Sequence, residues 1–244
     1  MPAHLTENAV YQKANVVPAP ILSRAVLEAD GMAAIVRRDA PGKVLQTEAQ
    51  LSRSLSEALK KRPPGEFWLF GYGSLIWNPA IRSSETRIAK IEGWHRSFCL
   101  SISAGRGTPD FPGLVLALDV GGACLGTAYR IDEEHLSSEL HLLWRREMLC
   151  AAYVPEWVEV RDQAGRMFGY SLAFTINPQS PHYASGLSNE AMVRTLATAS
   201  GGLGSSADYL FRTRDSLRAH GIPDLEIERL AAAVEDKLAG RMPG

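Results

Sequence analysis

The sequence is poor in the residues that disulfide frameworks and metal sites need. Its three cysteines and six histidines are scattered over 244 residues, without a Cys-x-x-Cys or His-Glu-x-x-His motif. An odd number of dispersed thiols is atypical of secreted disulfide-linked domains and of zinc sites. We therefore expect three unpaired cysteines in a reducing cytoplasm, and no metal site.

Charge of one sign and long apolar runs are also lacking. Lys and Arg number 26 against 27 Asp and Glu, a formal net charge of −1 that does not favour nucleic acid or an anionic membrane as partner. No uninterrupted apolar run is long enough to cross a bilayer, and the first residues lack the pattern of a secretory signal. The composition, 45% hydrophobic and 22% charged, is typical of a globular protein.

Two regions of the chain differ in pattern. Residues 1–65 are predicted to be an N-terminal extension, partly disordered, with one amphipathic helix near 47–60 that begins with a Thr47 and Gln50 capping box. Residues 66–240 show no linker or repeat and are predicted to be a single domain. There, short apolar runs alternate with glycine and proline up to residue 131, and a hairpin is expected across 162–165. The last third is helical. The pattern predicts an α+β fold, with a curled mixed sheet or small β-barrel and flanking helices.

The chain is organised around the stretch 67–79, Phe-Trp-Leu-Phe-Gly-Tyr-Gly-Ser-Leu-Ile-Trp-Asn-Pro. A buried strand leads into a loop with two glycines, Gly71 and Gly73. Backbone N–H groups in such a loop can hold a carboxylate or an oxyanion. A tight turn that only joins two core segments is the alternative.

Three known loop motifs do not fit this stretch. The dinucleotide-binding fingerprint needs glycine where Ile76 stands, the phosphate loop needs a lysine, and the nucleophile elbow needs glycines where Tyr72 and Ile76 flank Ser74. Ser74 is therefore predicted to be a hydrogen-bonding residue rather than a nucleophile. The loop is expected to bind something small and polar.

One carboxylate stands in line with an apolar helix stripe. A helix opening near Asp132 carries Leu136, Leu140 and Leu143 on one face, and Glu147 is the next member of that series. Partial burial would raise its pKa and suit it to general acid or base catalysis near neutral pH. Two alternatives are a Glu147 paired with a neighbouring arginine, and a stripe that ends one turn earlier.

These residues resemble the ChaC-type γ-glutamylcyclotransferases. The loop Phe70-Gly-Tyr-Gly-Ser-Leu-Ile-Trp77 is similar to that family's substrate loop, and Leu143-Trp-Arg-Arg-Glu-Met148 with Tyr153-Val-Pro-Glu-Trp-Val158 to its catalytic segment. The same order continues in four further pieces: Gly93-Trp-His-Arg-Ser-Phe98, Arg106-Gly107, Gly126-Thr-Ala-Tyr-Arg130 and Asp208-Tyr-Leu210. The resemblance covers about 66–236 and leaves the extension unexplained.

The resemblance implies a lyase that cleaves glutathione to 5-oxoproline and Cys-Gly without metal or cofactor. The α-amine of the γ-glutamyl group attacks its own γ-carbonyl, and Glu147 serves as base and then as acid. The implied substrate-binding residues are Gly71, Tyr72, Gly73, Ser74, Leu75, Ile76 and Tyr209. Backbone N–H groups of this loop could hold either the substrate carboxylate or the oxyanion.

Two other functions remain open from the sequence. One is a cyclotransferase for other γ-glutamyl amines or amino acids. The other, from a different class, is a non-catalytic regulator of cation transport. An intact Glu147 beside an intact glycine loop argues against a pure binder, which has no need of a buried carboxylate. The sequence sets no oligomeric state.

Overall fold

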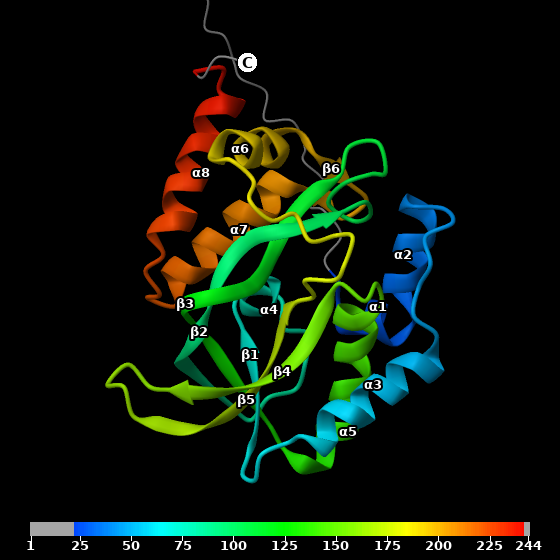
Figure 1. Cartoon of the computed structure of the whole chain (residues 1–244), viewed down its shortest axis with the longest axis vertical. Helices are drawn as coiled ribbons and strands as arrows, with labels where there is room; N and C mark the ends of the chain where they lie inside the picture. Colours follow the sequence, from blue (N-terminus) through cyan, green and yellow to red (C-terminus); the bar gives the residue numbers. More distant parts are fainter. Residues whose placement is uncertain (1–21, 242–244) are drawn as a thin grey trace, which may run out of the picture.

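Five strands close into a small barrel in the computed structural model, which describes residues 22–241 (Figure 1). The order around the barrel is β1 (Phe67–Gly71), β3 (Gly113–Ile131), β2 (Glu85–Ile102), β4 (Tyr153–Arg161) and β5 (Met167–Ile176). Pairing is antiparallel, except that β5 runs parallel to β1 and β3 and so closes the barrel. The predicted α+β class with a small mixed barrel is confirmed.

Helices cover the barrel on two sides (Figure 1). The N-terminal helices are α1 (Arg24–Glu28), α2 (Gly31–Asp39) and α3 (Glu48–Lys60), and they lie on the same side as α5 (Glu133–Leu143). The short α4 (Ser74–Trp77) follows β1, and a π-helical turn, η1 (Trp144–Met148), continues α5. The C-terminal third contains the minor strands β6 (Ser200–Gly201) and β7 (Gly204–Ser205) and the helices α6 (Asn189–Thr198), α7 (Ser206–Ala219) and α8 (Leu225–Leu238).

Strand β1 is buried on both faces, because a hydrophobic core lies on each. Trp68 and Phe70 belong to the core shared with α6, α7 and α8, whereas Phe67 and Leu69 belong to the core shared with α3 and α5. Successive side chains of a strand point to opposite faces, so a continuous apolar run suits this position. Full burial of each side chain stabilises the fold by roughly 1.5–3 kcal/mol. The loop after β1 thus follows a strand that is buried along its whole length.

Strands β2 and β3 are longer than the sequence indicates. The glycines at 93 and 121–122 suggest breaks between short strands, but the ladder continues past them with a register shift between Glu92 and Trp94. Gly93, Gly121 and Gly122 have φ values of 81°, 101° and 67°, which glycine adopts readily. At these residues the pairing of the two strands is irregular but does not end. The predicted hairpin across 162–165 joins β4 and β5 as expected.

The described part of the N-terminal extension is folded onto the domain. Helix α3 begins with Thr47 as N-cap, and both hydrogen bonds of the capping box with Gln50 are present. Residues 22–43, which show no strong periodicity, form α1 and α2. The expectation of partial disorder also concerns residues 1–21, which lie outside the described residues.

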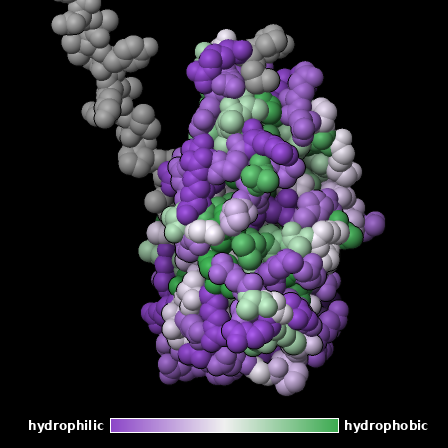
Figure 2. All heavy atoms as spheres, turned by 90° about the vertical axis from the view of Figure 1, so that its left-hand side faces the viewer, coloured by the Kyte–Doolittle hydropathy of each residue, from purple (hydrophilic) through white to green (hydrophobic). Residues whose placement is uncertain are grey.

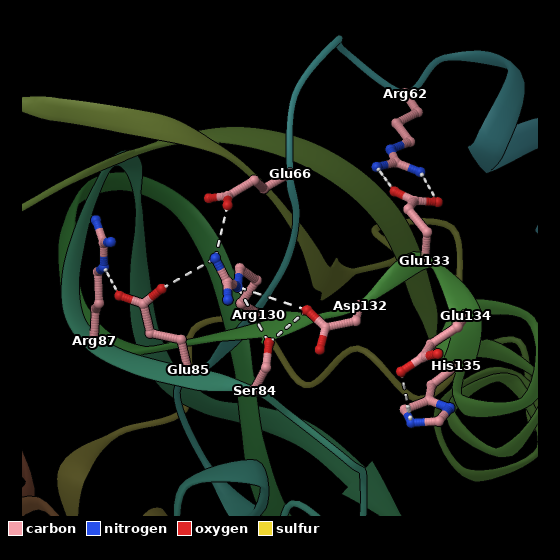
Figure 3. A network of polar contacts seen from close by, with 10 residues as sticks. All are labelled: Arg62, Glu66, Ser84, Glu85, Arg87, Arg130, Asp132, Glu133, Glu134 and His135. Carbon is pink, nitrogen blue, oxygen red and sulfur yellow. Dashed lines mark hydrogen bonds and ion pairs between the residues drawn. The ribbon is translucent and has the colours of Figure 1, made fainter.

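Arg130, at the end of β3, lies at the centre of a polar network at the base of the barrel (Figure 3). Its guanidinium lies 2.7 Å from Glu66, 3.5 Å from Glu85 and 3.8 Å from Asp132, and its Nε donates to Ser84 at 3.1 Å. Each exposed pair contributes at most about 1 kcal/mol. Together they tie the beginnings of β1, β2 and α5 to β3, and α5 leads to Glu147.

On the face that carries α8, apolar side chains gather in the middle of an otherwise hydrophilic surface (Figure 2). Between β2 and the helices α6 and α8 lies a groove whose lining includes Met192, Ile227 and Leu230. Among residues 22–241 no helix is long and apolar enough to cross a membrane.

Candidate active site

The loop between β1 and α4 forms one wall of a small pocket. The pocket brings together six of the eight site residues expected from the sequence: Tyr72, Gly73, Ser74, Leu75, Glu147 and Tyr209. Leu116, Tyr153 and Phe174 complete its lining. The other two expected residues do not line it. Gly71 is paired with Thr127 in the β1–β3 ladder, and Ile76 is buried in the core.

Both loop glycines are required by close packing rather than by a left-handed backbone. Gly73 has φ −135°, and a Cβ on it would lie 2.8 Å from the hydroxyl of Tyr209. A Cβ on Gly71 would lie 3.0 Å from the Tyr129 ring and 3.2 Å from Leu75. The glycines let the loop backbone approach the tyrosines, so the site can be narrow where the loop faces Glu147.

Glu147 lies on the π-helical turn η1 and not on a continuous α-helix. Helix α5 ends at Leu143, so the α-helical spacing that pointed to Glu147 does not extend to it. Its side chain is nevertheless only 12% exposed. Burial raises the pKa of this carboxyl above its usual value, and the neighbouring Arg146 lowers it in part. Single π turns are frequent at functional sites.

Arg146 connects Glu147 to the loop. Its Nε lies 2.8 Å from Glu147 Oε1, while its other nitrogens donate to Ser74 Oγ at 2.9 Å and to the Asn78 carbonyl at 2.6 Å. The contact with Glu147 lacks hydrogen-bond direction, so Oε1 is a buried acceptor without a directed donor among the described residues. The sequence offered a buried Glu147 and a Glu147 paired with arginine as alternatives, and the structure shows both together. The side chain that contacts the Ser74 hydroxyl is a guanidinium, which donates to it and cannot act as its base.

Three tyrosines, Tyr72, Tyr153 and Tyr209, line the same pocket as Glu147. Burial raises the pKa of Tyr209 to about 12 and those of Tyr72 and Tyr153 well above 10, so all three stay protonated at neutral pH. Tyr72 donates to the Phe174 carbonyl at 2.6 Å, and Tyr153 to the Leu116 carbonyl at 3.1 Å. Tyr153 was not among the predicted site residues, although it opens the second segment quoted for the resemblance.

A second, larger pocket of about 110 Å³ shares Ser74, Tyr153 and Tyr209 with the first. Eight further residues line it: Leu22, Trp77, Asn78, Arg106, Val115, Arg146, Leu203 and Arg212. We call it the arginine pocket. Sequence reasoning did not assign it, because residues from five separate segments meet there.

The arginine pocket is positively charged. Arg106 donates to Asp208 Oδ2 at 2.5 Å and to the Ser205 carbonyl at 3.2 Å, and Arg212 donates to Asp208 Oδ1 at 2.9 Å. One carboxylate thus partners two guanidinium groups, and the pair of arginines keeps an excess positive charge. An anionic part of a ligand would be attracted there.

The small mixed barrel with its flanking helices is a fold that solved structures share. The chain superposes on a yeast γ-glutamyl cyclotransferase specific to glutathione with a TM-score of 0.64, over 71% of this chain and 97% of the yeast chain. At 20% sequence identity, this likeness shows that the fold is shared.

The sequence comparisons define the family. The model for "ChaC-like protein" matches residues 67–237. A glutathione-specific γ-glutamylcyclotransferase of Escherichia coli is 41% identical over 82% of this chain and 87% of that protein. Glutathione-specific γ-glutamylcyclotransferase 1 of Homo sapiens is 33% identical over 70% and 78%. The chain belongs to the ChaC-like family, and the family expected from the sequence is confirmed.

Proposed function

We propose that the protein is a lyase that cleaves glutathione to 5-oxoproline and Cys-Gly. The observation that carries the proposal is the buried Glu147, whose Oε1 has no directed donor and whose side chain lines one pocket together with the glycine loop. A substrate ammonium group is the donor that this atom lacks. The relatives named as glutathione-specific γ-glutamylcyclotransferases support the choice of substrate.

The reaction requires one base that later acts as an acid. The α-amine nitrogen forms a bond to the γ-carbonyl carbon, and the bond from that carbon to the cysteine nitrogen breaks. The attacking nitrogen loses two protons as it changes from an ammonium group to the lactam N–H. Glu147 takes these protons in turn and passes them to the departing amine, which leaves as an ammonium group, so no water is consumed. Burial raises the pKa of Glu147, which makes the carboxylate a better proton acceptor, and Arg146 lowers that pKa in part, which favours release of the proton.

Orientation and charge stabilisation supply the rest of the rate. The loop and the tyrosines hold the γ-glutamyl group folded back, with its amine close to its own carbonyl. The N–H groups of Gly73, Ser74 and Leu75 are the candidate donors to the substrate carboxylate or to the oxyanion. The protonated Tyr153 and Tyr209 line the same pocket and add hydroxyl groups.

The arginine pocket favours a leaving group that carries a carboxylate. It adjoins the inner pocket at Ser74, Tyr153 and Tyr209, and Arg106 and Arg212 give it an excess positive charge. The glycine carboxylate of glutathione would enter there. A γ-glutamyl amine without a carboxylate would leave the excess positive charge of this pocket unneutralised, so the alternative of a general γ-glutamyl amine cyclotransferase is less favoured.

The proposed setting is the reducing cytoplasm, with a small peptide as substrate and neither nucleic acid nor membrane as partner. Cys99, Cys124 and Cys150 are unpaired thiols. Burial raises the pKa of each, which makes them poor nucleophiles.

Chelator-treated protein incubated with glutathione tests the proposal. 5-Oxoproline and Cys-Gly should appear in equal amounts, and faster than from γ-glutamyl amines that lack a carboxylate. A folded protein that releases no 5-oxoproline from glutathione would refute the proposal and favour a non-catalytic regulator. Equal rates across the panel would refute the assigned selectivity.

A further inference from the structure

A buried arginine that lines neither the pocket of Glu147 nor the arginine pocket donates a hydrogen bond to the backbone of the substrate loop. Arg96, on β2, has a side chain only 4% exposed. Its Nε donates to the Tyr72 carbonyl, one Nη donates to Asp224, and the other donates to the Leu125 carbonyl at 2.7 Å. One guanidinium therefore joins the loop, strand β3 and the start of α8.

The position of this guanidinium coincides with the end of a β ladder. The last paired residues of β1 and β3 are Gly71 and Thr127. Extending the antiparallel register by two residues would place Gly73 opposite Leu125. The backbone N–H and C=O groups of the loop would then be hydrogen-bonded to β3 and not free to bind a substrate. Instead, Arg96 takes the carbonyls of Tyr72 and Leu125. The guanidinium ends the ladder and separates the loop from β3.

The orientation of one peptide group follows from this contact. The Tyr72–Gly73 peptide is trans, so its C=O and N–H point in opposite directions. Since the Tyr72 carbonyl faces Arg96, the Gly73 N–H faces away from it. Gly73 lines the pocket that contains Glu147, whereas Arg96 does not.

We infer that Arg96 is a positioning residue, which turns the Tyr72–Gly73 peptide so that the Gly73 N–H is presented to the substrate. The inference rests on the proposed function. Arg96 touches no reacting atom and acts through the loop backbone. The planar fork of its guanidinium suits this task, because one lysine ammonium cannot reach the two carbonyls and the carboxylate in the same geometry.

The Arg96→Lys variant tests this role. It keeps the buried charge but loses the fork, so we expect kcat/KM for glutathione to fall at least tenfold, since a small misplacement of substrate-positioning groups has a large effect on rate. Arg214→Lys is the matched control. Arg214 also contacts an acidic residue of α8, Glu235, but not the loop, and its variant should stay within twofold of wild type.

Comparing kcat/KM between the two folded lysine variants separates a positioning role of Arg96 from a general effect on stability. A drop in kcat/KM for Arg96→Lys, in protein as well folded as the control, supports the inference. If wild type is active and Arg96→Lys is within twofold of it, or if both lysine variants lose activity equally, the inference is overturned. If wild type releases no 5-oxoproline, the proposed function fails and this inference fails with it.

A second measurement does not depend on the folding of Arg96→Lys. In Glu147→Gln protein labelled with [15N]glycine, the Gly73 amide resonance, assigned with Gly73→Ala, should shift on addition of glutathione. Gly165, in the exposed β4–β5 turn, serves as the internal reference and should not shift. An unmoved Gly73 resonance at saturating glutathione would overturn the inference.

Discussion

The carboxylate of Glu147 lies 2.8 Å from the guanidinium Nε of Arg146, the residue that precedes it in the chain. Adjacent side chains on an α-helix do not face each other. The π turn at Trp144–Met148 has more residues per turn, so successive side chains lie closer in direction. Because Arg146 also donates to Ser74, this turn couples the proposed base to the substrate loop.

Removing the charge at Arg146 should move the pH dependence of the reaction. Arg146 lowers the pKa of Glu147, so Arg146→Met should raise that pKa and shift the acidic limb of kcat/KM to higher pH. Arg146→Lys should leave the limb closer to its wild-type position. The control is Arg145→Met, since Arg145 pairs with the exposed Glu48. An unmoved limb in Arg146→Met would mean that another group sets it.

Glu147→Gln should gain stability relative to wild type as the pH rises. The folded pKa of Glu147 is raised, so between the unfolded and folded pKa values the folded protein binds more protons, and stability is lost as the pH rises through that window. Glutamine does not titrate, so the Glu147→Gln variant does not undergo this loss of stability. Melting temperatures at pH 4 and pH 8 test this: the difference between variant and wild type should be larger at pH 8. The same difference at both values would contradict a raised pKa.

Gly73→Ala should impair the site while the protein stays folded. The added Cβ would lie 2.8 Å from the Tyr209 hydroxyl, so the loop or the tyrosine must move. We expect kcat/KM to fall roughly 10–100-fold.

Two further variants make the cause specific. Gly73→Ala combined with Tyr209→Phe removes the clashing oxygen and should regain part of the loss. Gly169→Ala, where the nearest atom is 3.4 Å away on Trp68, should be near wild type. No effect of Gly73→Ala would show that the loop tolerates a Cβ and is not shaped around Tyr209.

The sequence predicts the parts of this site that depend on local pattern. The apolar run before Gly71 marks β1, and the leucines at 136, 140 and 143 lead to Glu147. The sequence does not predict the burial of Glu139, which lies on the same helix face as these leucines and is fully buried. No neighbouring residue in the sequence distinguishes it from a solvated glutamate. Its partner Arg24 lies 115 residues away.

Arg96 could not be located from the strand pattern for a different reason. Before Gly93 the buried positions of β2 are odd-numbered, at Ala89 and Ile91, whereas the next two buried side chains, Arg96 and Phe98, are even-numbered. Cys99 is also buried, at a second register shift between Ser97 and Leu100. The register irregularity at Gly93 exchanges the two faces. A regular alternation would place Arg96 on the exposed face. Irregularities of this kind depend on tertiary packing.

The buried Glu139 predicts a stabilising role for the N-terminal extension. Arg24 of α1 lies 2.6 Å from Glu139 Oε2, and the Arg82 N–H donates to the same oxygen at 3.1 Å. Arg24→Met would leave a buried carboxylate without its cation. We expect a loss of about 1–3 kcal/mol in the free energy of unfolding, below the value for a fully buried pair because Arg24 is partly exposed.

A double-mutant cycle with Glu139→Gln checks this coupling by chemical denaturation. The Arg24→Met substitution should cost less in the Glu139→Gln background, because no unpaired charge remains. Arg37→Met is the control, since Arg37 is largely exposed and lies 3.8 Å from Asp30. Equal costs of Arg24→Met in both backgrounds would show that the extension is not held by this ion pair.

The most direct test of the account is single-turnover formation of 5-oxoproline from glutathione by Glu147→Gln. Glutamine keeps the shape of the side chain but cannot accept the ammonium proton. The rate should fall by about 10²–10⁴-fold, while glutathione binding is retained by the loop and the arginine pocket. Glu134→Gln, an exposed change on α5, should match wild type. A Glu147→Gln protein that binds glutathione and turns it over at more than about a tenth of the wild-type rate would contradict the assignment of Glu147 as the base.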